Sequence, residues 1–144
     1  MTEELRESGR RVGFAVEDFA GERATLAHVR FDGPPRVGRY GVDLDAFERL
    51  ALPALLGAED AEVVLIDELG KMELASDSFR AAVSTVFVGG VPIVATVHAV
   101  RHPFTDALKN NASVETLAVS RRSRNELPEQ LVERLLGAGR GQTP

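Results

Sequence analysis

The sequence contains no cysteine, so disulfides, zinc–thiolate sites and thiol nucleophiles are excluded. It has no apolar run long enough to span a bilayer and no signal-peptide pattern at its N-terminus. We therefore predict a cytoplasmic protein with no membrane partner. Basic residues are not in excess either. The net charge of −5 argues against a nucleic-acid-binding surface, and we expect no nucleic-acid partner.

The composition is ordinary for one globular domain, with 44% hydrophobic and 27% charged residues. We predict a single domain over residues 1–144, with a hairpin and strand region at 1–43, an α/β core at 44–137 and a tail at 138–144. Apolar and polar residues alternate around a glycine-containing turn in residues 11–31, which predicts a β-hairpin. From residue 60 onward strand and helix patterns alternate, which favours a parallel sheet.

Two adjacent acids follow the apolar run Val63–Ile66. Unbroken apolar runs are typical of parallel strands covered on both faces, and open α/β sheets bind ligands at the carboxyl ends of their strands. Asp67 has the chemistry to hold a hard cation, and Glu68, beside the Gly70 turn, can orient or deprotonate a water. This is the pattern of the Walker B strand in nucleoside triphosphatases. The alternative is a parallel strand that simply ends in acidic loop residues.

Two further strands are predicted, over residues 91–97 and 114–119. Thr96 and His98 lie at the end of the first of these, where a group that senses the γ-phosphate would stand. A structural threonine is the alternative there. Helices are predicted from Asp43 or Asp45 to Gly57 with a break or restart at Pro53, and from Ser76 or Asp77 to Gly89.

Further helices are predicted over residues 102–109 and 125–137. One expected element has no counterpart in the sequence. A triphosphatase holds phosphate with G-x-x-x-x-G-K-[ST] between a strand and a helix, and no such segment occurs in the 144 residues. The pair Gly70-Lys71 is followed by Met72, and no glycine precedes Gly70 at the required spacing.

The whole chain resembles the small P-loop nucleoside-triphosphatases of archaea, thermophilic bacteria and animals, a family that includes an animal cancer-related type. The most specific match is IDELGKMEL at residues 66–74. The other matching stretches, in order, are TEELRE at 2–7, GRRVGF at 9–14, VGRY at 37–40, ALPAL at 51–55 and RNELP at 124–128. The order and spacing of these stretches agree with the family along the full chain.

The resemblance implies an α/β fold: a P-loop NTPase-like, mostly parallel sheet flanked by helices, with an N-terminal hairpin. In the family, the P-loop strand and the first helix come before the segment that matches residues 2–7. The sequence therefore resembles a member that lacks them, and we expect an N-terminally incomplete domain. A late start codon, a truncated gene and a divergent short form would each produce this pattern.

The resemblance also implies magnesium-dependent hydrolysis of nucleoside triphosphates, including ATP, GTP and pyrimidine nucleotides, to the diphosphate and phosphate. By resemblance, Asp67 is the Mg²⁺ partner and Glu68 the base that activates water. Lys71 is a candidate phosphate ligand, with pairing to Glu73 or a plain surface lysine as alternatives. Arg124 matches the family's arginine and is the preferred candidate to contact nucleotide. Arg121 and Arg122 belong to the same basic cluster, whose guanidinium groups could stack on a base or neutralise transition-state charge; a solvated loop is the alternative for these two.

Without a P-loop this chain lacks the lysine and backbone amides that hold the β- and γ-phosphates, so we expect weak hydrolysis or none. The alternative function is non-catalytic: a remnant of the family that binds nucleotide or docks to a partner. A partner that supplies a strand, or a second copy of the chain, would suit that alternative, because strand addition completes an open sheet.

Overall fold

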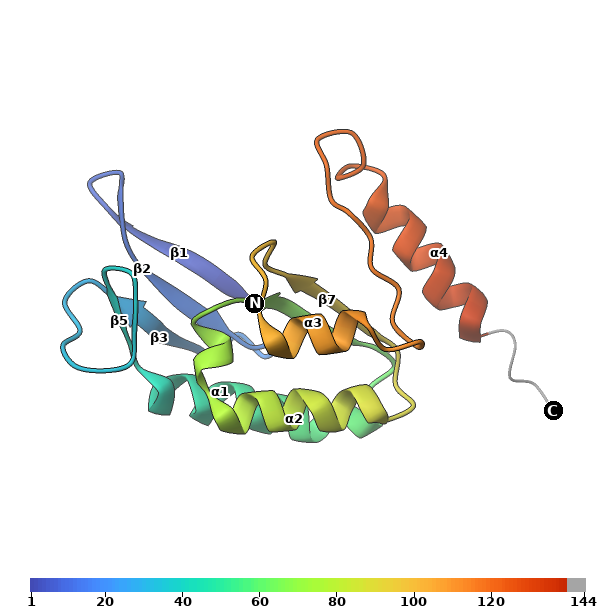
Figure 1. Ribbon diagram of the computed structural model, residues 1–144, viewed down its shortest axis with the longest axis horizontal. Helices are drawn as coiled ribbons and strands as arrows, with labels where there is room; N and C mark the ends of the chain where they lie inside the picture. Colours follow the sequence, from blue (N-terminus) through green and yellow to red (C-terminus); the bar gives the residue numbers. More distant parts are fainter. Residues whose placement is uncertain (140–144) are drawn as a thin grey trace. The chain divides into compact units, whose positions relative to one another are not determined.

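The computed structural model describes residues 1–139. The chain forms two compact units, Met1–Thr105 and Asp106–Pro144, and the described part of the second ends at residue 139. All the described strands, β1 to β7, and the helices α1 and α2 belong to the first unit (Figure 1). Assignment of the whole chain to one domain stays a prediction.

The N-terminal part of the first unit is a five-stranded antiparallel sheet with the strand order β1-β2-β3-β5-β4. Its strands are β1 Thr2–Glu7, β2 Arg10–Glu17, β3 Arg23–His28, β4 Arg36–Val37 and β5 Tyr40–Val42. The predicted hairpin is confirmed as β2 and β3. Strand β1 was not predicted, because its residues TEELRE show no apolar alternation and four of the six are exposed.

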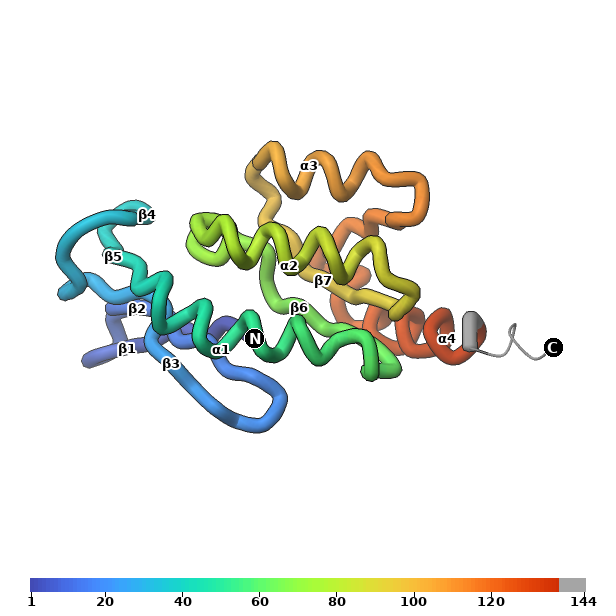
Figure 2. The backbone as a smooth tube through the Cα atoms, turned by 90° about the horizontal axis from the view of Figure 1, so that it is seen from below, coloured from blue at the N-terminus to red at the C-terminus, as the bar shows by residue number. Residues whose placement is uncertain are grey.

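Two helices, α1 Leu44–Leu56 and α2 Asp77–Val88, lie together on one side of the strands (Figures 1 and 2). Their first turns are capped as predicted. The Asp43 carboxylate accepts from the Ala46 N–H at 2.9 Å, and the Ser76 hydroxyl accepts from the Phe79 N–H at 2.9 Å. The predicted break at Pro53 is wrong. Helix α1 continues through this residue, which removes only its own N–H from the helix.

The core of this unit lies between the two helices and the strands. The rings of Phe47 and Phe79, one from each helix, meet edge to face with centroids 4.9 Å apart, and both are almost completely buried. Leu26 and Ala27 of β3 are fully buried next to α1. Burial of side chains of this size contributes about 1.5–3 kcal/mol each, so this core fixes the sheet against the helices.

A second, two-stranded sheet pairs β6 Val64–Leu69 with β7 Ile93–Val97 in parallel. Burial in β6 alternates, with Val64 and Ile66 buried but Leu65 62% exposed. The prediction that this strand is covered on both faces is therefore wrong in these residues. Its apolar run is unbroken, yet one face of the strand is open to solvent.

Two short 3₁₀ helices, η1 Gly57–Asp60 and η2 Glu73–Ala75, precede β6 and α2 respectively. Helix α3 Pro103–Lys109 begins in the first unit and ends in the second, which also contains α4 Leu127–Gly139. Helix α4 begins two residues after the predicted start and runs past Gly137. Its Arg134 pairs with Glu115 at 2.6 Å. The last residues of the predicted tail, 140–144, lie outside the described residues.

The strand predicted over residues 114–119 is wrong. These residues take no regular structure, because a strand needs a neighbour for its N–H and C=O groups and no described strand pairs with them. The predicted α/β class and N-terminal hairpin are confirmed. Parallel pairing is nonetheless less extensive than predicted, since β6 and β7 are the only parallel strands of residues 1–139. No helix in that range is long and apolar enough to cross a membrane.

Candidate active site

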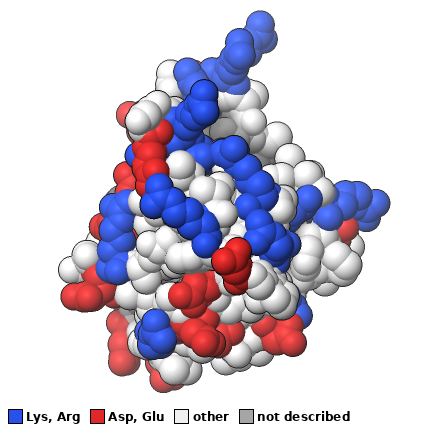
Figure 3. Space-filling view, turned by 90° about the vertical axis from the view of Figure 1, so that its left-hand side faces the viewer, with Lys and Arg blue, Asp and Glu red and all other residues white. Residues whose placement is uncertain are grey.

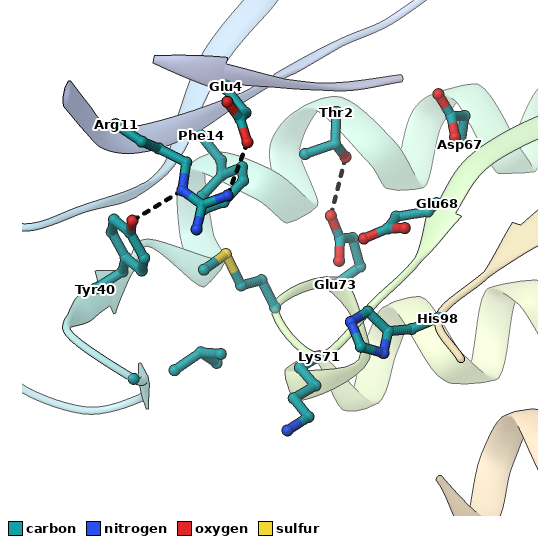
Figure 4. Close-up of a pocket in the computed structure, with 13 residues that line it drawn as sticks. Thr2, Glu4, Arg11, Phe14, Tyr40, Asp67, Glu68, Lys71, Glu73 and His98 are labelled. Carbon is teal, nitrogen blue, oxygen red and sulfur yellow. Dashed lines mark hydrogen bonds and ion pairs between the residues drawn. The ribbon is translucent and has the colours of Figure 1, made fainter. Parts of the chain in front are cut away.

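A cavity of about 660 Å³ lies at the carboxyl end of β6. Asp67, Glu68 and Glu73 line one side of it, and we call these residues the acid wall. Arg11, Phe14 and Tyr40 line another side, and we call them the arginine–aromatic wall (Figure 4). All six residues belong to the first unit. The cavity thus lies between the acidic end of β6 and the aromatic rings carried by β2 and β5.

Asp67 and Thr96 meet at the ends of the two parallel strands. The Thr96 hydroxyl donates to Oδ1 of Asp67 at 2.5 Å, and both side chains are exposed. Parallel pairing of β6 and β7 brings these two positions together, although they are 29 residues apart in the sequence. The Thr96 hydroxyl therefore orients the Asp67 carboxylate.

Glu68 and Glu73 approach each other across the Gly70 turn. A Cβ on Gly70 would lie 2.8 Å from Oε1 of Glu68 and 2.8 Å from Oε2 of Glu73. Only glycine leaves room for both carboxylates at this position. Figure 4 shows the Glu68 side chain directed toward Glu73, whereas that of Asp67 points elsewhere. Asp67 and Glu68, although adjacent in the sequence, therefore lie in different surroundings.

Glu73 is the buried acid of this wall, with 4% of its surface exposed. Its Oε1 accepts a hydrogen bond from the Thr2 hydroxyl at 2.9 Å. Burial raises the pKa of Glu73 above its ordinary value, and the negative charge of Glu68 raises it further; hydrogen bonds from Thr2 and from the backbone act in the opposite direction. Glu73 therefore holds a proton more readily than an exposed glutamate does.

The other predicted site residues of the first unit also border the cavity. Lys71 is exposed, and no ion pair joins it to Glu73 among the described residues, since the Glu73 carboxylate bonds to Thr2 instead. His98 lines the cavity, and its Nδ1 accepts from the Val100 N–H at 3.0 Å. Lys71 and His98 thus lie within the same space as the acid wall, but their roles stay predictions.

The predicted arginines lie in the second unit. Arg124 belongs to a turn in which its N–H donates to the Ser120 carbonyl at 3.0 Å. Its side chain is exposed, as are those of Arg121 and Arg122. Since Arg124 lies in a different compact unit from the cavity, its assignment to nucleotide also stays a prediction.

Sequence reasoning missed the arginine–aromatic wall. Arg11 donates from Nε to the Tyr40 hydroxyl at 3.1 Å and from Nη1 to Glu4 at 2.7 Å. The Phe14 and Tyr40 rings meet edge to face with centroids 5.3 Å apart. The available signal was the presence of these residues in the matching stretches at 9–14 and 37–40, but no spacing rule links them.

The face in Figure 3 is rich in basic side chains, despite the net charge of −5.

The acid wall suits a divalent cation such as magnesium that takes some of its ligands from the protein and others from a phosphate group. Among residues 1–139, no group of three or more histidine or carboxylate side chains is arranged to hold a metal alone. Mg²⁺ usually takes one or two carboxylates and completes its octahedral shell with water and substrate phosphates. Asp67, an exposed carboxylate oriented by Thr96 at the cavity, fits that arrangement.

The sequence of this chain is similar to those of known proteins. The profile of a family described as NTPase matches residues 1–132. A protein of Methanosarcina acetivorans named nucleoside-triphosphatase THEP1 is 40% identical over 137 residues, which cover 94% of this chain and 77% of that protein. The human cancer-related nucleoside-triphosphatase is 38% identical over 145 residues, covering 91% of this chain and 76% of the human protein.

Solved structures give the same result. The crystal structure of THEP1 from Aquifex aeolicus superimposes with a TM-score of 0.84 at 30% identity, covering 93% of this chain and 80% of that one. The solution structure of the human cancer-related nucleoside triphosphatase gives a TM-score of 0.77 at 36% identity. Fold and sequence therefore agree over almost the whole chain, which belongs to the family of small P-loop nucleoside-triphosphatases.

Proposed function

We propose that the cavity beside β6 is the site of a magnesium-dependent nucleoside-triphosphate phosphohydrolase, which converts a nucleoside triphosphate to the diphosphate and phosphate. One observation carries the proposal: Asp67 and Glu68 border the same cavity at the end of a parallel strand, and the Thr96 hydroxyl orients Asp67 at 2.5 Å. A space of about 660 Å³ is within the size range of ligand sites, roughly 300–1,000 Å³.

The residues of the acid wall take separate roles in this proposal. Asp67 holds Mg²⁺, which when bound neutralises charge on the phosphate oxygens. Glu68 accepts a proton from a water whose oxygen attacks the γ-phosphorus. The bond from that phosphorus to the bridging oxygen breaks, and its electron pair stays on the diphosphate.

Glu73 supports the assignment of Glu68 as the base. When two carboxylates lie close together, they do not both ionise easily, and the more buried one takes the proton first. Glu73 is the buried member and its pKa is raised. Glu68 is half-buried and faces the cavity, so it is the member of the pair that a water in the cavity can reach.

We further propose that turnover of this chain is weak. The 144 residues contain no G-x-x-x-x-G-K-[ST] segment, so the backbone cradle for the β- and γ-phosphates is missing from them. Lys71, His98 and Arg124 are the remaining candidates for phosphate contacts, and none replaces such a cradle. We expect phosphate release well below ~1 s⁻¹, the low end of ordinary enzyme turnover.

A non-catalytic function is the second candidate, and one feature favours it. Leu65 of β6 is 62% exposed, and residues 114–119 have no pairing strand among the described residues. Exposed apolar strand surface is typical of a sheet that adds a strand from a partner or a second copy. In that case the acid wall binds nucleotide without hydrolysing it.

Binding and phosphate release separate these proposals. Asp67→Asn is expected to weaken Mg²⁺-dependent ATP binding by about tenfold or more, because a carboxylate–cation contact is lost. Glu68→Gln is expected to keep ATP binding and to abolish the residual phosphate release. Calorimetry and a sensitive phosphate assay measure the two quantities.

Glu62→Gln serves as the control, because Glu62 is exposed and does not border the cavity. Hydrolysis that survives Glu68→Gln contradicts the assignment of the base. Binding of Mg²⁺–ATP with no phosphate release, before or after the substitution, supports the non-catalytic function instead.

A further inference from the structure

The arginine–aromatic wall carries a feature that hydrolysis of a phosphate does not require. Arg11 and Phe14 lie on β2 and Tyr40 lies on β5, and the three side chains gather on one side of the cavity (Figure 4). The Arg11 guanidinium lies 5.2 Å from the centre of the Phe14 ring and 6.0 Å from that of Tyr40. An arginine supported by aromatic rings in this way has the form of a stacking surface.

The guanidinium of Arg11 is also fixed in orientation. Nε donates to the Tyr40 hydroxyl and Nη1 donates to Glu4, at 3.1 and 2.7 Å. The Arg11 side chain nevertheless stays 45% exposed, because the group borders the cavity. A planar ligand that stacks on a side chain already held in place loses little conformational entropy. The wall is therefore preorganised for a flat ring.

We propose that the arginine–aromatic wall binds the nitrogenous base of a nucleotide or nucleoside, with Arg11 as the stacking residue and Phe14 and Tyr40 as its support. This proposal rests on the proposed function, since it assigns the acid wall to the phosphates and the second wall to the ring. Guanidinium and aromatic planes are the groups on which proteins stack bases.

The ring has two possible sources: the base of the triphosphate bound at the acid wall, or a separate nucleoside beside it. Three probes distinguish them in the presence of Mg²⁺, namely ATP, inorganic tripolyphosphate and adenosine. If the ring is the base of ATP itself, ATP should bind about tenfold more tightly than tripolyphosphate, as expected for one stacked base. If the ring belongs to a separate nucleoside, adenosine should bind to protein that already holds tripolyphosphate.

The variant Arg11→Lys keeps the charge and removes the planar group. We expect it to reduce the advantage of ATP over tripolyphosphate, or the affinity for adenosine, by about fivefold while leaving tripolyphosphate affinity unchanged. Arg23→Lys is the matched control, since Arg23 is an arginine of the same sheet that pairs with Glu3 and Glu17 and does not border the cavity. A merely structural role of Arg11 would alter both affinities together or neither.

A second measurement uses the unaltered chain and does not depend on the folding of a variant. Intermolecular nuclear Overhauser effects are expected between adenine protons, from ATP or from adenosine, and the side-chain protons of Arg11. The proposal is overturned if adenine from neither source contacts Arg11, or if Arg11→Lys leaves every adenine-dependent affinity unchanged.

The outcomes also separate this proposal from the proposed function. Tripolyphosphate binding that Asp67→Asn abolishes, without adenine contact at Arg11, supports the phosphate site and overturns the base site. Adenosine contact at Arg11 without Mg²⁺-dependent binding of ATP or tripolyphosphate supports the base site and overturns the phosphate site. If no probe binds, both proposals are wrong.

Discussion

The two walls of the cavity are built in opposite ways. The acid wall comes from one short segment, residues 67–73, in which a strand end and a tight turn set the positions of three carboxylates. The arginine–aromatic wall joins residues 29 positions apart, Arg11 and Tyr40, through the pairing of neighbouring strands. A local segment can thus carry a chemical signature in the sequence, whereas a wall assembled by sheet register carries none.

The walls also differ in how their charges are satisfied. Arg11 is bonded to Glu4 and Tyr40, so the positive charge of the second wall has partners at the surface. The acid wall instead brings the buried Glu73 close to Glu68, with one side-chain donor, Thr2, on Glu73. Two close carboxylates destabilise a fold unless one takes a proton or a cation binds. We therefore expect the acid wall to gain more from a bound cation than the arginine–aromatic wall would.

The largest expected effect comes from disturbing the sheet beneath the arginine–aromatic wall. In Gly41→Ala, the new Cβ would lie 2.3 Å from the Phe31 carbonyl oxygen, a backbone atom that cannot move away easily. We expect a loss of about 1–3 kcal/mol in the free energy of unfolding, as is usual for overpacking. Urea denaturation measures it.

Gly57→Ala is the matched control for this change, because a Cβ at Gly57 meets no atom within 4 Å. Equal stability of the two variants would show that the β5 backbone is not as closely packed as described. Ligand binding at the acid wall should survive Gly41→Ala in the folded fraction, which tests whether the two walls are separable.

The second prediction concerns the pH dependence of stability. Because burial raises the pKa of Glu73 in the folded state, the folded chain binds more protons than the unfolded chain between the ordinary glutamate pKa and the raised value. Its contribution to stability is present below the ordinary pKa and is lost as the pH rises through the raised one. Glu73→Gln, which cannot ionise, should flatten this part of the profile.

Urea denaturation at a series of pH values from about 4 to 8, which brackets the ordinary glutamate pKa, measures this effect. Glu62→Gln, an exposed glutamate, should leave the profile as it is in the original chain. A wild-type stability that rises with pH across the window, with no difference from Glu73→Gln, would mean that Glu73 is not the buried proton-holding group.

The smallest change in stability is expected for Gly70→Ala. The Cβ would meet carboxylate oxygens of both Glu68 and Glu73. Glu68 is half-buried and can turn away, whereas Glu73 is buried and bonded to Thr2 and has less room to move. We expect about 1 kcal/mol of destabilisation, because the atoms that must move belong to side chains and not to the backbone. The carboxylates would still be displaced, so Mg²⁺–ATP affinity should fall severalfold in calorimetry. An unchanged affinity would show that their placement does not matter for binding.

Much of the acid wall could be predicted from sequence because its information is local. The apolar run before Asp67, the turn at Gly70 and the capping residues Asp43 and Ser76 each specify structure within a few residues. These predictions agree with the observed β6, α1 and α2. The sequence placed Thr96 at the end of a second strand, but its hydrogen bond to Asp67 was not predicted.

The features that could not be predicted depend on distant neighbours. Strand β1 is polar except for Leu5 and forms only because β2 pairs with it. Residues 114–119 have an apolar strand pattern but no described partner, and they form no strand. The exposure of Leu65 depends on what covers β6, which its own sequence does not encode. Local propensity gives way to tertiary context in each case.

The central claim is tested most directly by nuclear magnetic resonance of the chain with Mn²⁺–ATP, since Mn²⁺ takes similar oxygen ligands to Mg²⁺ and broadens nearby signals. The account predicts broadening centred on the amides of Asp67 and Glu68 and extending to Thr96 and His98, with little effect at Glu62. Broadening centred on any other part of the chain, with the β6 end unaffected, would contradict the assignment of this cavity to a cation and phosphate.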